Sequence, residues 1–339
     1  MSTAATPQPA TPEPAAPEDG AAEMPGIAAE RIAGAPISWG VCEVPDWGHQ
    51  LAAGRVLAEM RDLGLAATEF GPDGFLPGDP AERSGLLDAH GLRPVGGFVP
   101  LVLHDPDRDP LPEIARALDA FGDGGATVVL AAATGVDGYD GRPALDAKGW
   151  DTLLRNLSKV AGHALGRGHR ATLHPHVGTM VEGPEEVGRV LDGTDVPLCL
   201  DTGHLLIGGV DPLALARSAA DRIAHVHLKD VDAALAGDVR GGRVPYTEAV
   251  RAGIYRPLGG GDIDIPGIVR ALEGAGYDGW YVMEQDTILA AEPARGTGPW
   301  DDVRESIAFL VSGGDGGDGG DGGHGGDAAA SRARKDGTA

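Results

Sequence analysis

The sequence predicts an α/β protein that folds as a (β/α)₈ barrel with a disordered tail at each end. Three observations support this fold class: short β-rich runs alternate with helical segments, the runs number eight, and both ends have a composition that cannot form a core. Alternating strands and helices are typical of a parallel sheet. Eight such units predict that the sheet closes on itself.

The expected strands are short runs rich in branched and aromatic side chains. They cover residues 36–42, 67–70, 93–102, 127–131, 170–174, 196–200, 223–228 and 280–284. The expected helices cover residues 52–63, 81–90, 111–121, 148–166, 184–191, 211–220, 265–274 and 301–312. Glycines in DLGLAATEF and GAGYDGWYVME predict helix ends just before the second and eighth strands. An open doubly wound sheet is less favoured, because no GxGxxG follows the first strand.

The two ends of the chain differ in composition from the middle. Residues 1–30 are rich in Pro, Ala and Glu, and residues 313–339 form a Gly/Asp repeat with a short basic end. Neither segment can bury enough apolar area to order itself. The repeat lacks the apolar position that calcium-binding nonapeptides need for a β-helix. We therefore expect disordered tails on either side of one catalytic barrel domain, residues 31–312.

Composition excludes several classes of partner. The formal net charge of −24 over 339 residues disfavours binding to nucleic acid or to anionic membranes. Cys42 and Cys199 form no CxxC motif, which excludes a disulfide framework and a zinc finger and suits a reducing cytoplasm. No apolar run approaches the ~18 residues of a membrane span, and no signal peptide is recognisable. The expected partner is a small molecule.

Ionisable side chains collect where the expected strands end. In (β/α)₈ barrels the reactive groups lie at the carboxyl ends of the strands and in the loops that follow. Six of the eight expected strands finish on residues that serve as metal ligands or acid–base groups: Glu69, His104, His174 with His176, Asp201 with His204, His227 with Lys229 and Asp230, and Glu284. Their coincidence at one mouth predicts a site.

The stretch AHVHLKDVD shows how one strand divides such roles. His225 and His227 are two residues apart, so their side chains point to the same face of a strand. His227 lies nearer the carboxyl end and is expected to be a metal ligand. His225 lies one pleat deeper and is expected to be a packed or hydrogen-bonded core histidine. Lys229 follows on the same face at the mouth.

A buried cluster of carboxylates and histidines needs a cation to offset repulsion and the loss of hydration. The mixed oxygen and nitrogen donors predict a divalent metal ion, Mn²⁺, Co²⁺, Fe²⁺, Zn²⁺ or Mg²⁺. Imidazole ligands shift the preference away from Mg²⁺ and Ca²⁺, and we expect Mn²⁺ or Co²⁺.

The strand-end motifs D-x-x-H and H-x-K-D, with a closing glutamate, resemble the xylose isomerase-like (sugar phosphate isomerase/epimerase) barrels. The stretches ISWGVCEVPDWG, ATEFGPDGFLP and LHPHVGT are most similar to the inosose dehydratase group. The resemblance covers about residues 33–311 and implies one divalent ion. The implied ligands are His174 or His176, Asp201, His227 and Glu284. This chain departs from the family at the fifth strand, where a histidine replaces a glutamate.

The resemblance implies a dehydratase acting on a cyclic polyol ketone, 2-keto-myo-inositol, in inositol catabolism. A single remaining glutamate removes the symmetric carboxylate pair of the isomerases and epimerases, and elimination needs one base and one acid. His176, Lys229 and Glu69 are the candidate bases. Lys229 could instead hold an enolate oxygen as a cation, or form a salt bridge with Asp230. His204 is expected to support a ligand or to protonate the leaving hydroxyl.

Three further residues are expected to contact the substrate. Trp39 is expected to form an apolar wall, and His104 to add a further contact. The resemblance implies that Arg256, in the long loop after the seventh strand, also reaches the substrate. Phe70 fits either that wall or the core. Other functions compatible with the barrel are a ketose isomerase or epimerase, a 3-dehydroshikimate-type dehydratase, or a non-catalytic sugar-binding protein. The acidic charge argues against an endonuclease IV relative. Such barrels often form homo-oligomers.

Overall fold

The strands of the protein form a closed parallel barrel. The structure is a computed structural model that describes residues 24–314 apart from residues 124 and 137. Its barrel strands neighbour each other in the order β1-β10-β7-β6-β5-β4-β3-β2, and all of these pairs are parallel. The strands are β1 (Ile32–Gly34), β2 (Ala67–Glu69), β3 (Arg93–Leu101), β4 (Thr127–Ala132), β5 (Ala171–Leu173), β6 (Leu198–Asp201), β7 (Ile223–Leu228) and β10 (Tyr281–Met283). The predicted fold class is confirmed.

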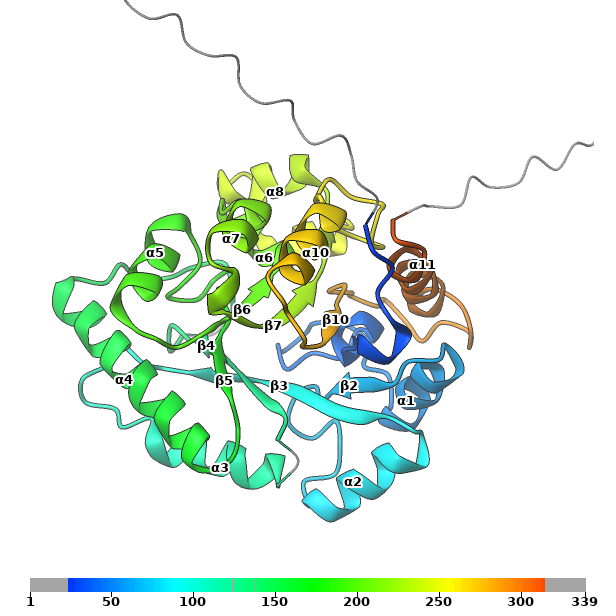
Figure 1. The fold of residues 1–339 in the computed structure, drawn as a ribbon, viewed down its shortest axis with the longest axis horizontal. Coiled ribbons are helices and arrows are strands. Elements are labelled where there is room, and N and C mark those ends of the chain that lie inside the picture. The colour runs from blue at the N-terminus through cyan, green and yellow to red at the C-terminus, as the bar shows by residue number, and fades with distance from the viewer. Residues whose placement is uncertain (1–23, 124, 137, 315–339) are drawn as a thin grey trace, which may run out of the picture.

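Helices surround the barrel, as Figure 1 shows. Those that connect successive strands are α1 (Ala53–Asp62), α2 (Pro80–Ala89), α3 (Leu111–Phe121), α4 (Ala147–Gly166), α5 (Pro184–Gly193), α7 (Pro212–Ser218) and α10 (Ile265–Gly274), and α11 (Pro299–Ser312) follows the last strand. Several begin with proline in the first turn and an aspartate cap, as Asp79 does for α2 and Asp211 for α7. The predicted helix ends are confirmed at Gly64 and Gly276, whose φ values are +81° and +84°.

The first strand lies earlier in the chain than expected. Residues 36–42 were predicted to be a strand, but the strand is Ile32–Gly34 and Pro36–Trp39 is a 3₁₀ helix. Pro36 has no N–H to give to a ladder and its fixed φ suits the first turn of a helix. Gly40, at φ +78°, ends that turn. The change places Trp39 outside the barrel wall.

A long insertion separates β7 from β10. It holds the two-stranded antiparallel sheet β8 (Asp230–Val231) and β9 (Tyr255–Arg256), with helices α8 (Ala233–Arg240) and α9 (Tyr246–Arg251) between them. Neither these helices nor α6 (Thr202–Gly208) follows from the strand–helix alternation of the sequence. All of them lie at the carboxyl end of the barrel, where they shape the site.

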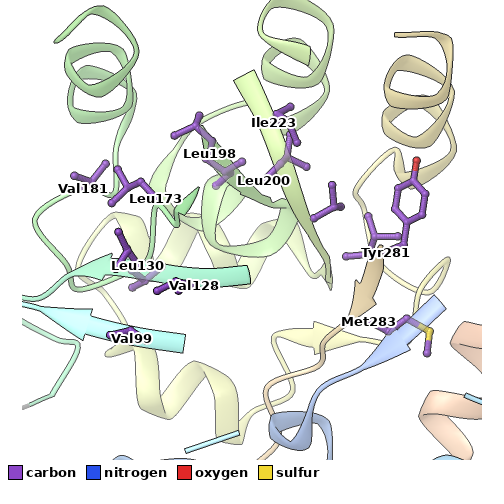
Figure 2. Close-up of a cluster of buried hydrophobic side chains, with 14 of the residues drawn as sticks. Val99, Val128, Leu130, Leu173, Val181, Leu198, Leu200, Ile223, Tyr281 and Met283 are labelled. Atoms are coloured by element: carbon purple, nitrogen blue, oxygen red, sulfur yellow. The ribbon is translucent and has the colours of Figure 1, made fainter. Parts of the chain in front are cut away.

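Large apolar side chains fill the layer between the strands and the helices. Figure 2 shows members of this core, including Leu130, Leu198, Leu200 and Tyr281, all fully buried. Side chains alternate along each strand, so the neighbours of these residues face the barrel interior. Small apolar residues fill the barrel interior below the polar groups, away from the carboxyl ends of the strands, among them Ala33, Ala67 and Val282. Small residues leave room for polar groups above them.

The folded chain extends beyond the expected domain boundary at its N-terminal side. Met24 and Ile27 are 4% and 5% exposed, and the Ile27 N–H donates to the carbonyl of Leu310 on α11. The predicted tail of residues 1–30 is therefore too long by at least the segment 24–30. Residues 1–23 and 315–339, the rest of the two predicted tails, lie outside the described residues. Among the helices that the structure describes, none combines the length and apolar character needed to cross a membrane.

Candidate metal centre and active site

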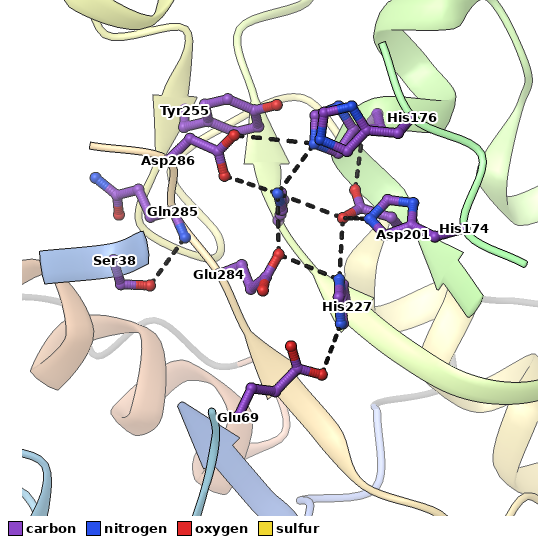
Figure 3. A network of polar contacts seen from close by, with 12 residues as sticks. Ser38, Glu69, His174, His176, Asp201, His227, Tyr255, Glu284, Gln285 and Asp286 are labelled. Carbon is purple, nitrogen blue, oxygen red and sulfur yellow. Dashed lines mark hydrogen bonds and ion pairs between the residues drawn. The ribbon is translucent and has the colours of Figure 1, made fainter. Parts of the chain in front are cut away.

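The carboxyl ends of the strands open into a cavity of about 500 Å³. Side chains predicted to do chemistry line it from four strand ends and the loops after them: Glu69, His174, His176, His227, Lys229 and Glu284. Asp201 and His204 are fully buried beneath the lining residues, and both contact the Nζ of Lys229. The barrel therefore brings together eight of the ten strand-end residues, several of which Figure 3 labels, while His104 and Asp230 are not among the residues that line the cavity.

The protonation of His227 follows from its neighbour Glu69. Nε2 of His227 lies 3.0 Å from Oε1 of Glu69, and Nε2 of His225 lies 2.7 Å from the same oxygen. A carboxylate only accepts, so both Nε2 atoms carry the proton. Burial alone would raise the pKa of Glu69, but His227 and His225 hold it far below its usual value. The prediction that His225 is a hydrogen-bonded core histidine is confirmed.

Four acceptor atoms face one another beside His227. Its Nδ1 lies 3.1 Å from Oε2 of Glu284 and 3.4 Å from Oδ2 of Asp201. Nε2 of His174 lies 3.3 Å from the same Asp201 oxygen, while the Nδ1–H of His174 donates to the carbonyl of Pro175. Both ring nitrogens thus face carboxylate oxygens, and each offers a lone pair to a metal ion when its ring is neutral. Asp201 Oδ2 and His227 Nδ1 are buried without a hydrogen-bond partner.

Such a set of lone pairs fits a cation at its centre. Ligand atoms about 2.1 Å from a shared ion lie about 3.0–3.4 Å apart, which is the spacing found here. The main chain holds one of the donors in place, because the other Asp201 oxygen caps α6 by accepting from the N–H of His204. The candidate metal ligands are His174, Asp201, His227 and Glu284, and the geometry selects His174 over His176 at the end of β5.

Lys229 is held as a cation beside these carboxylates. Its Nζ donates to Oδ1 of Asp286 (2.7 Å), to Oε2 of Glu284 (3.0 Å) and to Nε2 of His204 (3.2 Å). Burial would lower the pKa of Lys229, but Asp201, Asp286 and Glu284 together raise it well above its usual value. Lys229 is therefore an electrophilic group rather than a base.

Asp230 does not pair with Lys229. Its two oxygens accept from the backbone N–H groups of Val231, Gly259, Gly261 and Ile263 at 2.9–3.0 Å. Burial nevertheless raises the pKa of this carboxyl above its usual value. Asp230 thus anchors the loop after β9 and leaves the ammonium of Lys229 to the cavity.

His176 presents a free nitrogen to the cavity. Its Nδ1–H donates to the carbonyl of Val177 at 2.7 Å, and its Nε2 makes no hydrogen bond with a described residue. The ring stacks on His204 with 3.6 Å between ring centres. Burial, with His174 next in size, lowers the pKa of His176 well below its usual value, and burial with His176 does the same to His204. Both rings are neutral.

His204 is not among the residues that line the cavity. It accepts from Lys229 and supports the ring of His176 from behind. This placement suits the supporting role considered for it and not the protonation of a leaving group.

The three expected substrate contacts lie away from the cavity. Trp39 is fully buried at the end of the 3₁₀ helix Pro36–Trp39, and its Nε1–H donates to Glu59 of α1. Arg256 reaches Asp232 across 3.3 Å on a partly exposed edge. His104 follows the end of β3 and contributes nothing to the lining. Phe70 packs in the core, with its ring 4.9 Å from that of Phe121.

Other residues take the places that these were expected to fill. Trp47, eight residues after Trp39, lines the cavity and donates its Nε1–H to the carbonyl of Thr287. Tyr139 lies beside His176, with 4.9 Å between ring centres. A second tryptophan in SWGVCEVPDWG was a signal for Trp47; nothing local pointed to Tyr139.

Asp286 is the polar residue that sequence reasoning missed. It follows Glu284 by two residues, a spacing that keeps both on one face of an extended chain. Besides Lys229 it accepts from the hydroxyl of Tyr246 at 2.8 Å, and that hydroxyl lies 2.9 Å from the hydroxyl of Tyr255. Burial raises the pKa of Asp286 above its usual value. The two tyrosines come from the insertion between β7 and β10.

Comparison with known proteins agrees with the fold. A family model described as xylose isomerase-like TIM barrel matches residues 57–312. The rhizopine catabolism protein MocC of Rhizobium meliloti is 36% identical over 266 residues, covering 76% of this chain and 81% of that protein. Inosose dehydratase of Geobacillus thermodenitrificans is 32% identical over 273 residues, covering 76% and 90%. A solved structure of L-ribulose 3-epimerase has a TM-score of 0.60 at 20% identity and covers 84% and 94%.

Proposed function

Because the chain belongs to the xylose isomerase-like TIM barrel family, we propose that it is a metal-dependent dehydratase that removes water from a cyclic polyol ketone. The substrate in this proposal is 2-keto-myo-inositol and the product a trihydroxycyclohexane-dione. Relatives named inosose dehydratase support it, one of them matched over 90% of its length. The observation that carries it is His174 at the end of β5, which faces Asp201 and leaves Glu284 as the carboxylate on the other side of the ligand set.

His174, Asp201, His227 and Glu284 would hold the cation, for which we propose Mn²⁺ or Co²⁺. A divalent ion bound there supplies Lewis acidity at the ketone oxygen and so increases the acidity of the neighbouring C–H. The orphaned lone pairs of Asp201 and His227 support this assignment.

His176 acts as the base in this proposal, because its Nε2 is unpartnered and reaches the cavity while Nδ1 is fixed by Val177. It removes the proton α to the ketone. The ammonium of Lys229 stabilises the negative charge that develops on the oxygen. The β-hydroxyl then leaves with the proton carried by the His176 imidazolium, so that one C–H and one C–O bond break, one C=C bond forms and one water is released.

Epimerisation is the competing outcome on this barrel. It would return the α-proton to the opposite face of the ring, which requires a second acid–base group across from the first. Lys229, another acid–base candidate that lines the cavity, is an ammonium held by Asp286, Glu284 and His204. Because Asp201, Asp286 and Glu284 raise the pKa of Lys229 well above its usual value, this ammonium is a poor proton donor, which favours elimination over proton return.

The test is to strip the protein of metal with a chelator, add back Mn²⁺ or Co²⁺, and supply 2-keto-myo-inositol in D₂O. We expect enone-type absorbance to rise with the restored metal and the dione to accumulate. An epimerised ketose that has kept its hydroxyl and gained deuterium would show that the protein is an epimerase and not a dehydratase. If neither product forms with either metal, 2-keto-myo-inositol is not the substrate.

A further inference from the structure

We propose that the substrate carries a hydroxylated substituent, a glycosyl unit, bound in a second lobe of the same cavity; this rests on the proposed function. The lobe is defined by Pro72 and Asp73 after β2, Pro100 of β3, and Arg116, Ala117 and Ala120 of α3, all of which line the cavity together with the catalytic groups. No part of the proposed elimination uses these residues.

The lobe exists because β2 and β3 differ in length. β2 ends at Glu69, opposite Gly96, whereas β3 continues to Leu101. The chain after β2 therefore turns away through Gly71, at φ +71°, and leaves the upper part of β3 uncovered on this side. The cavity passes through that opening to α3.

One face of α3 borders the opening. The cavity-lining positions Glu113, Arg116, Ala117 and Ala120 are spaced as i, i+3, i+4 and i+7, which places them in one stripe along the helix. The two alanines leave space beside the strand that longer side chains would fill. Ile114 and Leu118, both fully buried, hold the adjacent face of α3 in the core, so the stripe is fixed in position.

The size of the cavity exceeds what the unsubstituted ring needs. A six-membered polyol ketone with about 12 non-hydrogen atoms fills less than half of the space at ordinary packing density. The volume of about 500 Å³ is instead in the range of sites that enclose larger ligands. A second sugar ring accounts for the difference.

The charges at the lobe select the kind of substituent. Arg116 is an exposed side chain that borders the cavity and makes no hydrogen bond or ion pair with any described residue. Asp73 and Glu113 offer acceptors beside it, although Arg108 engages one Glu113 oxygen at 2.9 Å. A hydroxyl both donates and accepts, so it matches this mixture. A phosphate or carboxylate would meet two carboxylates in a chain of net charge −24.

The decisive variant is Ala117→Trp, which adds bulk to the lobe at a position that the proposed elimination does not use. Leu165→Trp, on the exposed face of α4 at a residue 71% exposed, is the matched control for adding a tryptophan to a helix. The two probes are 2-keto-myo-inositol and the corresponding ring ketone of a galactosyl-myo-inositol. For the wild type we expect kcat/KM at least 10-fold higher with the galactosylated ketone.

Ala117→Trp should lower kcat/KM at least 10-fold for the galactosylated ketone and less than 2-fold for the plain one, and Leu165→Trp should change neither. Arg116→Ala should raise KM for the galactosylated ketone alone. Equal effects of Ala117→Trp on both probes, or a wild type that prefers the plain ketone, would overturn the inference.

A binding measurement separates this inference from the proposed chemistry. Calorimetry with the unoxidised galactosyl-myo-inositol and with myo-inositol needs no turnover. If neither ketone is dehydrated, the proposed function fails, and the second lobe still stands if the galactoside binds at least 10-fold tighter than myo-inositol and Ala117→Trp removes the difference. If the two bind alike, the inference fails whether or not the enzyme is active.

Discussion

The ammonium of Lys229 lies 2.7 Å from one oxygen of Asp286, and the hydroxyl of Tyr246 donates to the other oxygen at 2.8 Å. Asp286 comes after β10, Lys229 after β7 and Tyr246 from the insertion between those strands. The carboxylate thus joins three segments and sets the position of the cation at the mouth. A hydrogen bond between charged groups of this kind is typically worth about 1.5–3 kcal/mol.

Asp286→Asn keeps the shape of that side chain and removes its charge. We expect kcat to fall about 10- to 100-fold, since the loss of a charged hydrogen bond of ~1.5–3 kcal/mol releases Lys229 from its position. Tyr246→Phe removes one neutral hydrogen bond and should cost less, about 10-fold or below. Steady-state kinetics measures both, with Asp62→Asn at an exposed position as control. Unchanged kcat in Asp286→Asn would show that Lys229 holds its position without this partner.

Replacing the cation tests its proposed role on the developing negative charge. Lys229→Met should lower kcat about 10²- to 10³-fold, the usual cost of removing one group that stabilises an oxyanion. Lys229→Arg should not restore the rate, because a planar guanidinium cannot satisfy the three partners grouped around a compact Nζ. Circular dichroism must first show that both variants fold. A Lys229→Met enzyme with nearly full activity would exclude the role.

The metal assignment predicts a loss of bound ion independent of activity. Glu284→Gln replaces one candidate ligand with an amide, which carries no charge, and should lower the bound divalent metal after dialysis to well below one per chain. Glu292→Gln, at a side chain that is 60% exposed, should keep the wild-type content. Elemental analysis by mass spectrometry gives the content directly. A wild-type metal content in Glu284→Gln would show that the metal site lies elsewhere.

Gly96 makes room for the carboxylate that orients His227. A Cβ at this position would lie 2.6 Å from Oε1 of Glu69 and 3.2 Å from Nε2 of His225. Gly96→Ala should therefore destabilise the protein by about 1–3 kcal/mol, as overpacking of a core does, and weaken metal binding as well. Gly54→Ala has nothing within 4 Å and should be neutral or stabilising by up to about 1 kcal/mol. Denaturant unfolding compares the two, and equal stabilities would contradict the packing.

Both cysteines should be unreactive while the protein is folded. Burial, reinforced by Glu43, raises the pKa of Cys42 far above its usual value, and burial raises the pKa of Cys199 to about 11. The thiolate is the reactive form, and both groups stay protonated at pH 8. Iodoacetamide at pH 8 should modify neither in native protein and both in denaturant, as intact mass will show. Rapid native labelling of Cys42, which borders the cavity, would mean that its thiol is solvated.

Most of the candidate metal centre could be predicted from the sequence because its members stand at strand ends. Parallel strands in a closed barrel deliver their carboxyl ends to one mouth, so local patterns around Asp201, His227 and Glu284 were enough to place them together. The first strand was misplaced for a local reason too: Ile32–Gly34 is only three residues long, while ISWGVC beyond it is richer in β-forming residues. That stretch does not form a strand because Pro36, directly before it, cannot donate to a β-ladder and favours the first turn of a helix.

The substrate side of the cavity could not be predicted in this way. Trp47, Tyr139 and Tyr246 lie in loops and in the insertion, whose paths are set by long-range contacts that have no periodic pattern in the sequence. Arg256 was expected at the substrate because of the resemblance to the family, and the structure pairs it with Asp232 instead, beside the β8–β9 pairing.

The sequence by itself determined the barrel, the deeper position of His225 and the set of groups that meet at the mouth, because strand periodicity and strand-end position are local properties. Only the tertiary structure decided the charge and orientation of those groups. Glu69 makes His227 a donor at Nε2 and leaves its Nδ1 for a ligand, and three carboxylates keep Lys229 charged. Proton positions depend on distances between atoms from different strands, and those distances exist only once the barrel has closed.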